Sequence, residues 1–298
     1  MRLISFAGEA GTRIGLIEPE AGFVVDLQAA DPRLPWDMAS LIAHGDAGRE
    51  AVHTAAEQAG PQARLALESV TVLPPLPLPV RNIMCVGKNY AAHASEFRGT
   101  AGTASGVNGD LPEHPIVFTK ASTAVTGPGD AIPAYLDPTE SVDYEGELAV
   151  VIGTGGRGIR ASDAWDHVFG YALVNDVTSR ELQKRHGQWF LGKSLDGFCP
   201  MGPMLVSADE VPGIRSARLT TTVNGELRQS GCLADLIFDI PTLIATLSRS
   251  MTLVPGDVIA TGTPEGVGVG FSPPKYLGAG DEVAVHVTGI GTLRNPVA

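Results

Sequence analysis

Short runs of Val, Ile and other aliphatic residues recur along the chain beyond residue 80, and each run ends at Gly, Pro or Asp. Such runs favour strands, and the residues that end them favour turns. Because few helical segments separate the runs, a doubly wound parallel sheet is not expected. The pattern predicts a mixed α+β fold that is mainly β, with a mixed or antiparallel sheet folded on itself. Helices are expected near residues 90–97, 161–169, 178–187 and 240–250.

A proline-rich segment, LPPLPLPV at residues 73–80, precedes these runs. Its four prolines cannot continue a helix or lie in a central strand, so it is expected to be a stiff connector. Before it, two strand-like runs are followed by an Ala-rich stretch of helical periodicity between Pro35 and Ala66. We therefore expect a small N-terminal α/β domain over residues 1–75 and a larger domain over residues 76–298.

The 298-residue chain carries a formal net charge of −12 and no run of Lys and Arg, which excludes the usual binder of nucleic acid or of an anionic membrane. Its first residues lack the pattern of a secretory signal, and no apolar run approaches the length of a membrane span. A cytoplasmic protein is expected.

The three cysteines are widely spaced and odd in number, which argues against a disulfide framework and against a CxxC zinc site.

The segment VDYEGELAVV carries carboxylates at alternate positions. If it is one strand, Asp143, Glu145 and Glu147 share a face. Another carboxylate, Asp176, ends the apolar run GYALVND. A solvated sheet edge would explain these residues without any function, but the apolar continuation LAVVIG indicates burial, which is costly for like charges unless a cation joins them. Oxygen ligands without Cys or His select Mg²⁺, Mn²⁺ or Ca²⁺ over zinc, and Glu145, Glu147 and Asp176 are predicted to bind such an ion.

The segment GKNYAAHASEF places His93 and Glu96 three residues apart, and therefore on one face if the segment is helical. An ordinary pair on a helix surface has the same spacing. As a functional pair, the carboxylate would orient the imidazole and raise its basicity, which suits the activation of water. We expect Lys88, nearby, to face solvent rather than to act as an auxiliary cation.

Other residues that could complete a site follow in the chain. Arg180 and Gln183 share a helix face in TSRELQ, where arginine could clamp a carboxylate or form an ordinary surface salt bridge. Lys193 lies among apolar residues and glycines, which favours a charge-stabilising role over a snorkelling one. The glycine-rich run ATGTPEGVGVGF could present Thr263 and backbone N–H groups to an anion, or could simply be a tight connection.

The segment from Arg98 to His114 is rich in Gly, Ala, Ser and Thr and has almost no large apolar residues. It is expected to be a loop. It could be a tolerated surface insertion or a lid over a nearby site, and its position directly after His93 and Glu96 favours the lid.

Several of these segments together resemble the fumarylacetoacetate hydrolase family, in particular its acylpyruvase-like and 2-hydroxyhepta-2,4-diene-1,7-dioate isomerase-like branch. VGKNYAAHASE is similar to the family's VGxNYxxHxxE element, and DYEGELA to its metal-binding strand. NDVTSRELQ resembles its third-ligand segment, GKSLDGFCPMGP its lysine loop and TGTPEGVG its late glycine-rich loop. The resemblance covers roughly residues 80–298, with the motifs in the family's order.

The resemblance implies a mixed β-sandwich roll, usually dimeric, so a homodimer is expected. It implies Mg²⁺ or Mn²⁺ as the ion at the carboxylates. It also implies roles for the other residues: catalysis by His93, Glu96 and Lys193, and substrate contacts by Arg180, Gln183 and Thr263.

The reaction that this resemblance favours is hydrolysis of a C–C bond in an acylpyruvate or a related 2,4-diketo acid, through a metal-stabilised pyruvate enolate. The partner would be a small 2-oxo acid. A lyase or isomerase that uses the same enolate is the alternative, for example an oxaloacetate decarboxylase or a hydroxymuconate-type diacid isomerase. A protein that only binds an oxo acid is the alternative from another class.

Overall fold

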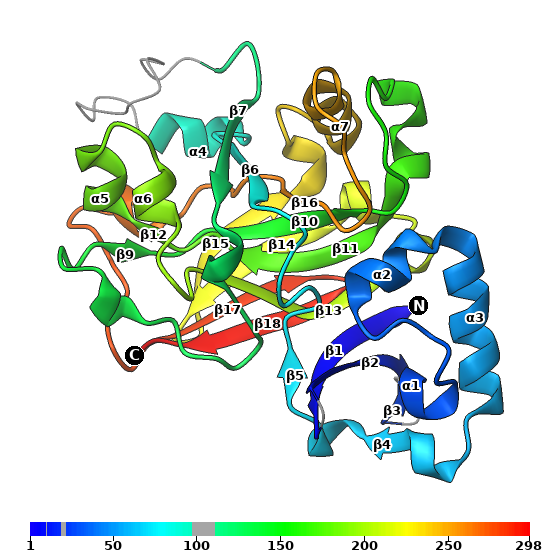
Figure 1. Cartoon of the computed structure of the whole chain (residues 1–298). Coiled ribbons are helices and arrows are strands. Elements are labelled where there is room, and N and C mark those ends of the chain that lie inside the picture. The colour runs from blue at the N-terminus through cyan, green and yellow to red at the C-terminus, as the bar shows by residue number, and fades with distance from the viewer. Residues whose placement is uncertain (10, 19–21, 97–110) are drawn as a thin grey trace.

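The computed structural model describes residues 1–9, 11–18, 22–96 and 111–298. A 12-stranded mixed sheet runs through the whole molecule (Figure 1). Its main path is β4 (Arg64–Ala66), β3 (Phe23–Asp26), β2 (Gly11–Glu18), β1 (Arg2–Gly8), β13 (Cys199–Ser207), β11 (Val168–Asn175), β10 (Gly146–Ile152), β16 (Val258–Ala260), β6 (Ile83–Gly87) and β7 (Ile116–Lys120). Off this path, β5 (Val72–Leu73) pairs with β1, and β8 (Val125–Thr126) pairs with β13.

Two smaller antiparallel sheets complete the β-structure. One has the order β15 (Glu226–Cys232), β14 (Arg218–Val223), β17 (Glu282–Val287) and β18 (Gly291–Pro296), and the other pairs β12 (Thr178–Ser179) with β9 (Val142–Asp143). The β14–β15 hairpin turns at Asn224-Gly225, where both residues have positive φ, as this turn type requires.

Helices are short and lie around the sheets. They are α1 (Leu27–Ala30), α2 (Met38–Ala43), α3 (Gly45–Gln58), α4 (Ala91–Glu96), α5 (Arg180–Arg185), α6 (Phe190–Lys193) and α7 (Ile240–Ser248). The 3₁₀ segments are η1 (Pro61–Ala63), η2 (Leu67–Ser69), η3 (Ser122–Ala124), η4 (Ala134–Leu136), η5 (Ala161–His167), η6 (Ala208–Glu210), η7 (Ile214–Ser216), η8 (Leu233–Asp235) and η9 (Gly268–Gly270). Of the expected helices, 161–169 is a 3₁₀ segment, and 178–187 begins at Arg180 because Ser179 caps it by accepting from Leu182 N.

The core lies on both faces of β10. Leu148 and Val150 pack in one apolar cluster with Val285 of β17, which layers the four-stranded sheet against the large one. Ala149 and Val151 face a second cluster that extends to the N-terminal strands and helices. This alternation leaves the N-terminal end of β10 between the two layers, and Figure 1 places α4, α5 and α6 near that end.

The N-terminal strands continue the large sheet, because β1 pairs with β13 through Arg2↔Val206 and Leu3↔Leu205. The division at residues 75 and 76 stays a prediction. The predicted fold class, mixed α+β and mainly β, is confirmed. Among the described residues, no helix is long and apolar enough to cross a membrane.

Candidate active site

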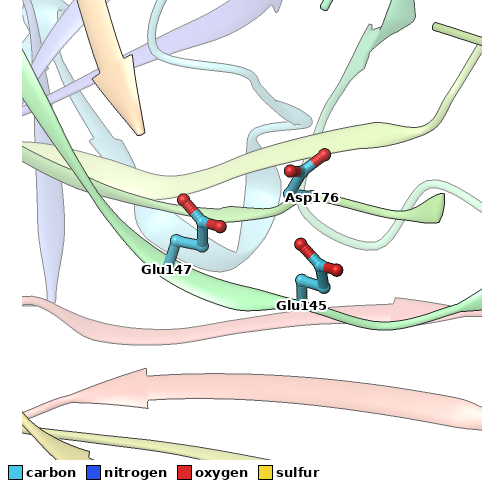
Figure 2. A group of neighbouring side chains, drawn as sticks. All are labelled: Glu145, Glu147 and Asp176. Carbon is cyan, nitrogen blue, oxygen red and sulfur yellow. The ribbon is translucent and has the colours of Figure 1, made fainter. Parts of the chain in front are cut away.

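The three carboxylates predicted to bind a metal ion lie together at the start of β10. Glu145, Glu147 and Asp176 each offer an oxygen within 4.8 Å of the others, and all three side chains are buried. Figure 2 shows the side chains pointing toward one another from two neighbouring segments. The pairing of β10 with β11 brings the segments together, and Asp176 N donates to Glu145 O at 2.8 Å.

The segment VDYEGELAVV is not one strand, as the sequence suggested, but two. β9 pairs with β12 and β10 pairs with β11, so the chain changes partner at Tyr144 and Glu145. At this break Glu145 N donates to the side-chain Oδ1 of Asn175 at 2.9 Å instead of to a ladder carbonyl. The break separates Asp143 from the carboxylate triad, and Asp143 pairs with Arg180 Nε at 2.8 Å.

Cationic side chains surround the carboxylates. Lys193 Nζ lies 2.7 Å from Glu145 Oε2 and 2.7 Å from Asp176 Oδ2, so it has the negative partners that its apolar surroundings led us to expect. Arg180 Nη1 lies 2.7 Å from Glu145 Oε1. Lys120, at the end of β7, places Nζ 2.7 Å from Asp176 Oδ1. Lys120 was not among the residues predicted from the sequence, where its only signal is its place at the end of the apolar run IVFT.

The pKa values of Glu145 and Glu147 shift in opposite directions, because the cations lie beside Glu145. Burial raises the pKa of Glu145, but the charges of Lys193 and Arg180 outweigh burial and hold the pKa well below its usual value. Burial lowers the pKa of Lys193, but the charges of Asp176 and Glu145 raise it overall, so Lys193 stays an ammonium ion. Burial, followed by the charges of Asp176 and Glu145, raises the pKa of Glu147 well above its usual value.

Glu147 is therefore the carboxylate of the triad whose negative charge is least compensated by neighbouring cations. Gly262 N donates to its Oε2 at 2.8 Å, and no salt bridge reaches it within the part of the chain that the structure describes.

The charges of this cluster fit a divalent cation. With all four carboxylates ionised, Asp143 included, they exceed the three cationic side chains by one negative charge. A bound divalent ion would turn this excess into a positive one and would make the site suitable for an anion. The donors of the triad are all carboxylate oxygens, which suits Mg²⁺, Mn²⁺ or Ca²⁺.

The predicted dyad is formed, and His93 is buried instead of lying on a helix surface. His93 Nδ1 lies 2.8 Å from Glu96 Oε2, and the other oxygen of Glu96 accepts from Gly266 N at 2.7 Å. The glycine-rich run connects the dyad to the triad, because Gly266 N donates to Glu96 and Gly262 N donates to Glu147. Lys88 was expected to face solvent, which is wrong: it is 6% exposed, with φ 54°, and burial lowers its pKa.

The glycine-rich run at 260–271 links the two groups of residues. Its backbone N–H groups at Gly262, Gly266 and Gly268 donate to Glu147, Glu96 and Asp143 respectively. The anions that the run holds in this structure are thus carboxylates of the protein. Gly266 must be glycine, because its φ is +99° and a Cβ would lie 1.9 Å from Arg228 O.

The residues predicted to contact substrate lie around the same cluster. Thr263 Oγ1 donates to Gly146 O at 2.9 Å and accepts from Gln229 Nε2 at 2.7 Å, so it anchors the glycine-rich run to β10. Arg180 reaches Gln183 Oε1 at 3.4 Å while it holds Asp143 and Glu145. Their contacts with substrate, and the catalytic roles of the dyad and Lys193, stay predictions. Residues 98–110 of the predicted lid lie outside the described residues.

Replacing Lys120 with methionine is expected to lower the free energy of unfolding of the metal-free protein by about 3–5 kcal/mol, because it leaves Asp176 with less compensation in a buried site. Urea unfolding monitored by circular dichroism measures this change. Lys275→Met removes the exposed pair with Glu226 and serves as control, with little change expected. Equal stabilities of both variants and the parent would contradict the ion pair of Lys120.

Comparisons with known proteins identify the family and relatives of this chain. The model of the fumarylacetoacetate (FAA) hydrolase C-terminal family matches residues 82–298. The chain is 48% identical over 286 residues to "Oxaloacetate tautomerase YisK" of Bacillus subtilis, and the match covers 92% of this chain and 92% of the relative. It is 41% identical over 302 residues to "Oxaloacetate tautomerase FAHD2B, mitochondrial" of Bos taurus, which covers 100% of this chain and 91% of the relative.

The fold is also shared with solved structures. The maleylpyruvate hydrolase from Sphingobium sp. SYK-6, in complex with manganese (II) ion and pyruvate, has a TM-score of 0.78 to this structure and 33% sequence identity. The match covers 100% of this chain and 99% of that one. Together with the buried triad, this neighbour indicates a divalent metal.

Proposed function

The chain belongs to the fumarylacetoacetate hydrolase family, and we propose that it is a divalent-metal-dependent enzyme that interconverts the keto and enol forms of a small 2-oxo dicarboxylic acid, oxaloacetate. The observation that carries the proposal is the buried carboxylate triad with an acid–base dyad and a lysine ammonium beside it. The relatives named as oxaloacetate tautomerases support the choice of reaction and substrate. Both relatives cover nearly the whole chain.

The metal ion would be held by Glu145, Glu147 and Asp176. When bound, it supplies Lewis acidity, which draws electron density from a 2-oxo group and makes a proton on the adjacent carbon easier to remove. An ion held by carboxylate oxygens keeps positions open to water and substrate, as expected for Mg²⁺ or Mn²⁺.

His93 would move the proton. Because Glu96 accepts at Nδ1, the favoured tautomer carries the lone pair on Nε2, which can take a proton from C3 of the keto acid. The C2–C3 double bond forms as that C–H bond breaks, and the proton returns to the oxygen on C2 to give the enol. Lys193, held as an ammonium ion, would stabilise the negative charge that develops on that oxygen.

Hydrolysis of an acylpyruvate is the second candidate, and the likeness to maleylpyruvate hydrolase favours it. In that reaction His93 would deprotonate a water molecule that attacks the distal carbonyl. The C–C bond then breaks, and pyruvate and a carboxylic acid are released. Decarboxylation of oxaloacetate and isomerisation of a hydroxymuconate-type diacid would use the same residues in other steps. A cytoplasmic homodimer stays a prediction.

The proposal is tested by adding freshly dissolved enol-oxaloacetate to the protein with Mg²⁺ or Mn²⁺ and following the loss of enol absorbance. We expect faster conversion to the keto form without release of CO₂, and no acceleration after chelation of the metal. Acetylpyruvate is the parallel substrate, with pyruvate formation as the signal. Cleavage of acetylpyruvate without tautomerase activity would replace the first candidate by the second, and release of CO₂ would indicate the lyase.

A further inference from the structure

Tyr144 lies between Asp143 and the metal ligand Glu145, at the point where β9 ends and β10 begins. Its side chain is fully buried, and its hydroxyl donates to Gly266 O at 2.8 Å. The two residues are 122 positions apart in the chain. Packing alone does not account for a hydroxyl here, because phenylalanine would fill the same apolar surroundings of Val142 and Val177.

Gly266 connects Tyr144 to the dyad. Its N–H donates to Glu96 Oε1 at 2.7 Å, and Glu96 Oε2 lies 2.8 Å from His93 Nδ1. Hydrogen bonds at the C=O and the N–H of Gly266 therefore link the segment between β9 and β10 to the imidazole. Other contacts hold the glycine-rich run at its two sides: Gly262 N donates to Glu147, and Gly268 N donates to Asp143. Among the hydrogen bonds of the described chain, the one from Tyr144 fixes the carbonyl of Gly266 itself.

We propose that Tyr144 is a positioning residue that sets the place of the His93–Glu96 dyad relative to the metal ligands. It acts through Gly266 and Glu96 and does not touch the reacting atoms. The consequence for activity rests on the proposed function, since it requires that His93 transfers a proton. The consequence for the geometry of His93 does not.

The physical reason is that proton transfer depends steeply on the alignment of the base. Without the hydroxyl, Gly266 is held less tightly, its N–H turns away from Glu96, and Glu96 orients the imidazole less well. The ligand oxygens of Glu145, Glu147 and Asp176 are held by other groups, namely Lys193, Arg180, Lys120 and Gly262 N. Metal affinity should therefore change little.

Kinetics of Tyr144→Phe give the first test. We expect kcat for enol-oxaloacetate to fall about tenfold, while KM and the affinity for Mn²⁺ measured by calorimetry stay near the parent values. In the background of Glu96→Gln, which already weakens the dyad, Tyr144→Phe should cause little further loss. Tyr171→Phe is the matched control, because it removes another buried tyrosine hydroxyl from the large sheet, and parent kinetics are expected.

Nitrogen NMR of protein labelled in its 7 histidines gives a test that needs no turnover. In Tyr144→Phe the ring signals of His93 should shift or broaden, while those of His44 and His167, which bond to backbone carbonyls elsewhere, stay in place. If the protein does not act on oxaloacetate, only the kinetic test is lost. Unchanged His93 signals, a loss of equal size in the Glu96→Gln background, or weakened Mn²⁺ binding with an unchanged dyad would each overturn the proposal.

Discussion

Replacing Glu147 with glutamine is expected to lower kcat by about 10³-fold or more and to make the metal-free protein more stable than the parent. The loss of activity follows because one of three ligands disappears, and the Lewis acidity of a bound ion contributes several kcal/mol to such reactions. The gain in stability follows because Glu147 is a buried carboxyl beside Asp176 and Glu145 with the least compensated charge. The amide of glutamine is neutral and can still accept from Gly262 N.

The sign of the stability change depends on pH. Burial and neighbouring carboxylates raise the pKa of Glu147 above its value in the unfolded chain, so deprotonation of the metal-free protein costs stability as the pH rises. Below the usual pKa of glutamate, parent and variant should be equally stable. Toward neutral pH the variant should become the more stable of the two.

Three measurements check this prediction: kcat with saturating Mg²⁺, calorimetric titration with Mn²⁺, and urea unfolding in the presence of a chelator. Glu265→Gln, an exposed glutamate in the same glycine-rich run, is the matched control and should behave like the parent. A Glu147→Gln protein that keeps parental turnover and parental affinity for Mn²⁺ would remove Glu147 from the metal site.

The clustering of the three carboxylates was within reach of sequence reasoning because the relevant geometry is local. Glu145 and Glu147 are two residues apart, and side chains two apart on a strand point to the same face. Asp176 ends an apolar run, and antiparallel pairing brings that end to the start of β10. The prediction that all of VDYEGELAVV forms one alternating strand was wrong, because its first residues pair with β12, which is distant in the sequence.

The missed contacts depend on strand order. Lys120 reaches Asp176 because β7 is joined to the sheet through β6, and nothing in the sequence around IVFTK fixes that order. Lys88 looked exposed because lysine usually is, whereas its left-handed backbone after β6 leads to a buried site. The hydrogen bond between Tyr144 and Gly266 could not be predicted from local sequence either, because the two residues are 122 positions apart. Sequence patterns thus indicated the three carboxylates, whereas the residues that contact them are brought near only by the tertiary structure.

Replacing His93 with glutamine is expected to lower kcat for the keto–enol conversion by about 10²–10⁴-fold, the usual contribution of a general base, while Mn²⁺ affinity stays near the parent value. Glutamine can still bond to Glu96 but cannot accept and release a proton at neutral pH. His167→Gln is the matched control, because His167 is only partly buried and its Nδ1 bonds to the carbonyl of Thr154, outside the candidate site. Its kinetics should match the parent.

The same variant separates the reaction classes of this family. Tautomerisation and hydrolysis both need a base, for a carbon acid or for water, so both should collapse together in His93→Gln. Decarboxylation of oxaloacetate expels CO₂ without removing a proton from carbon, and it needs only the positive charges at the 2-oxo group. Stopped-flow measurement of enol decay and coupled detection of CO₂ on the same samples distinguish these cases. Full tautomerase activity in His93→Gln would mean that another group carries the proton, and that the dyad serves the structure of the glycine-rich run instead.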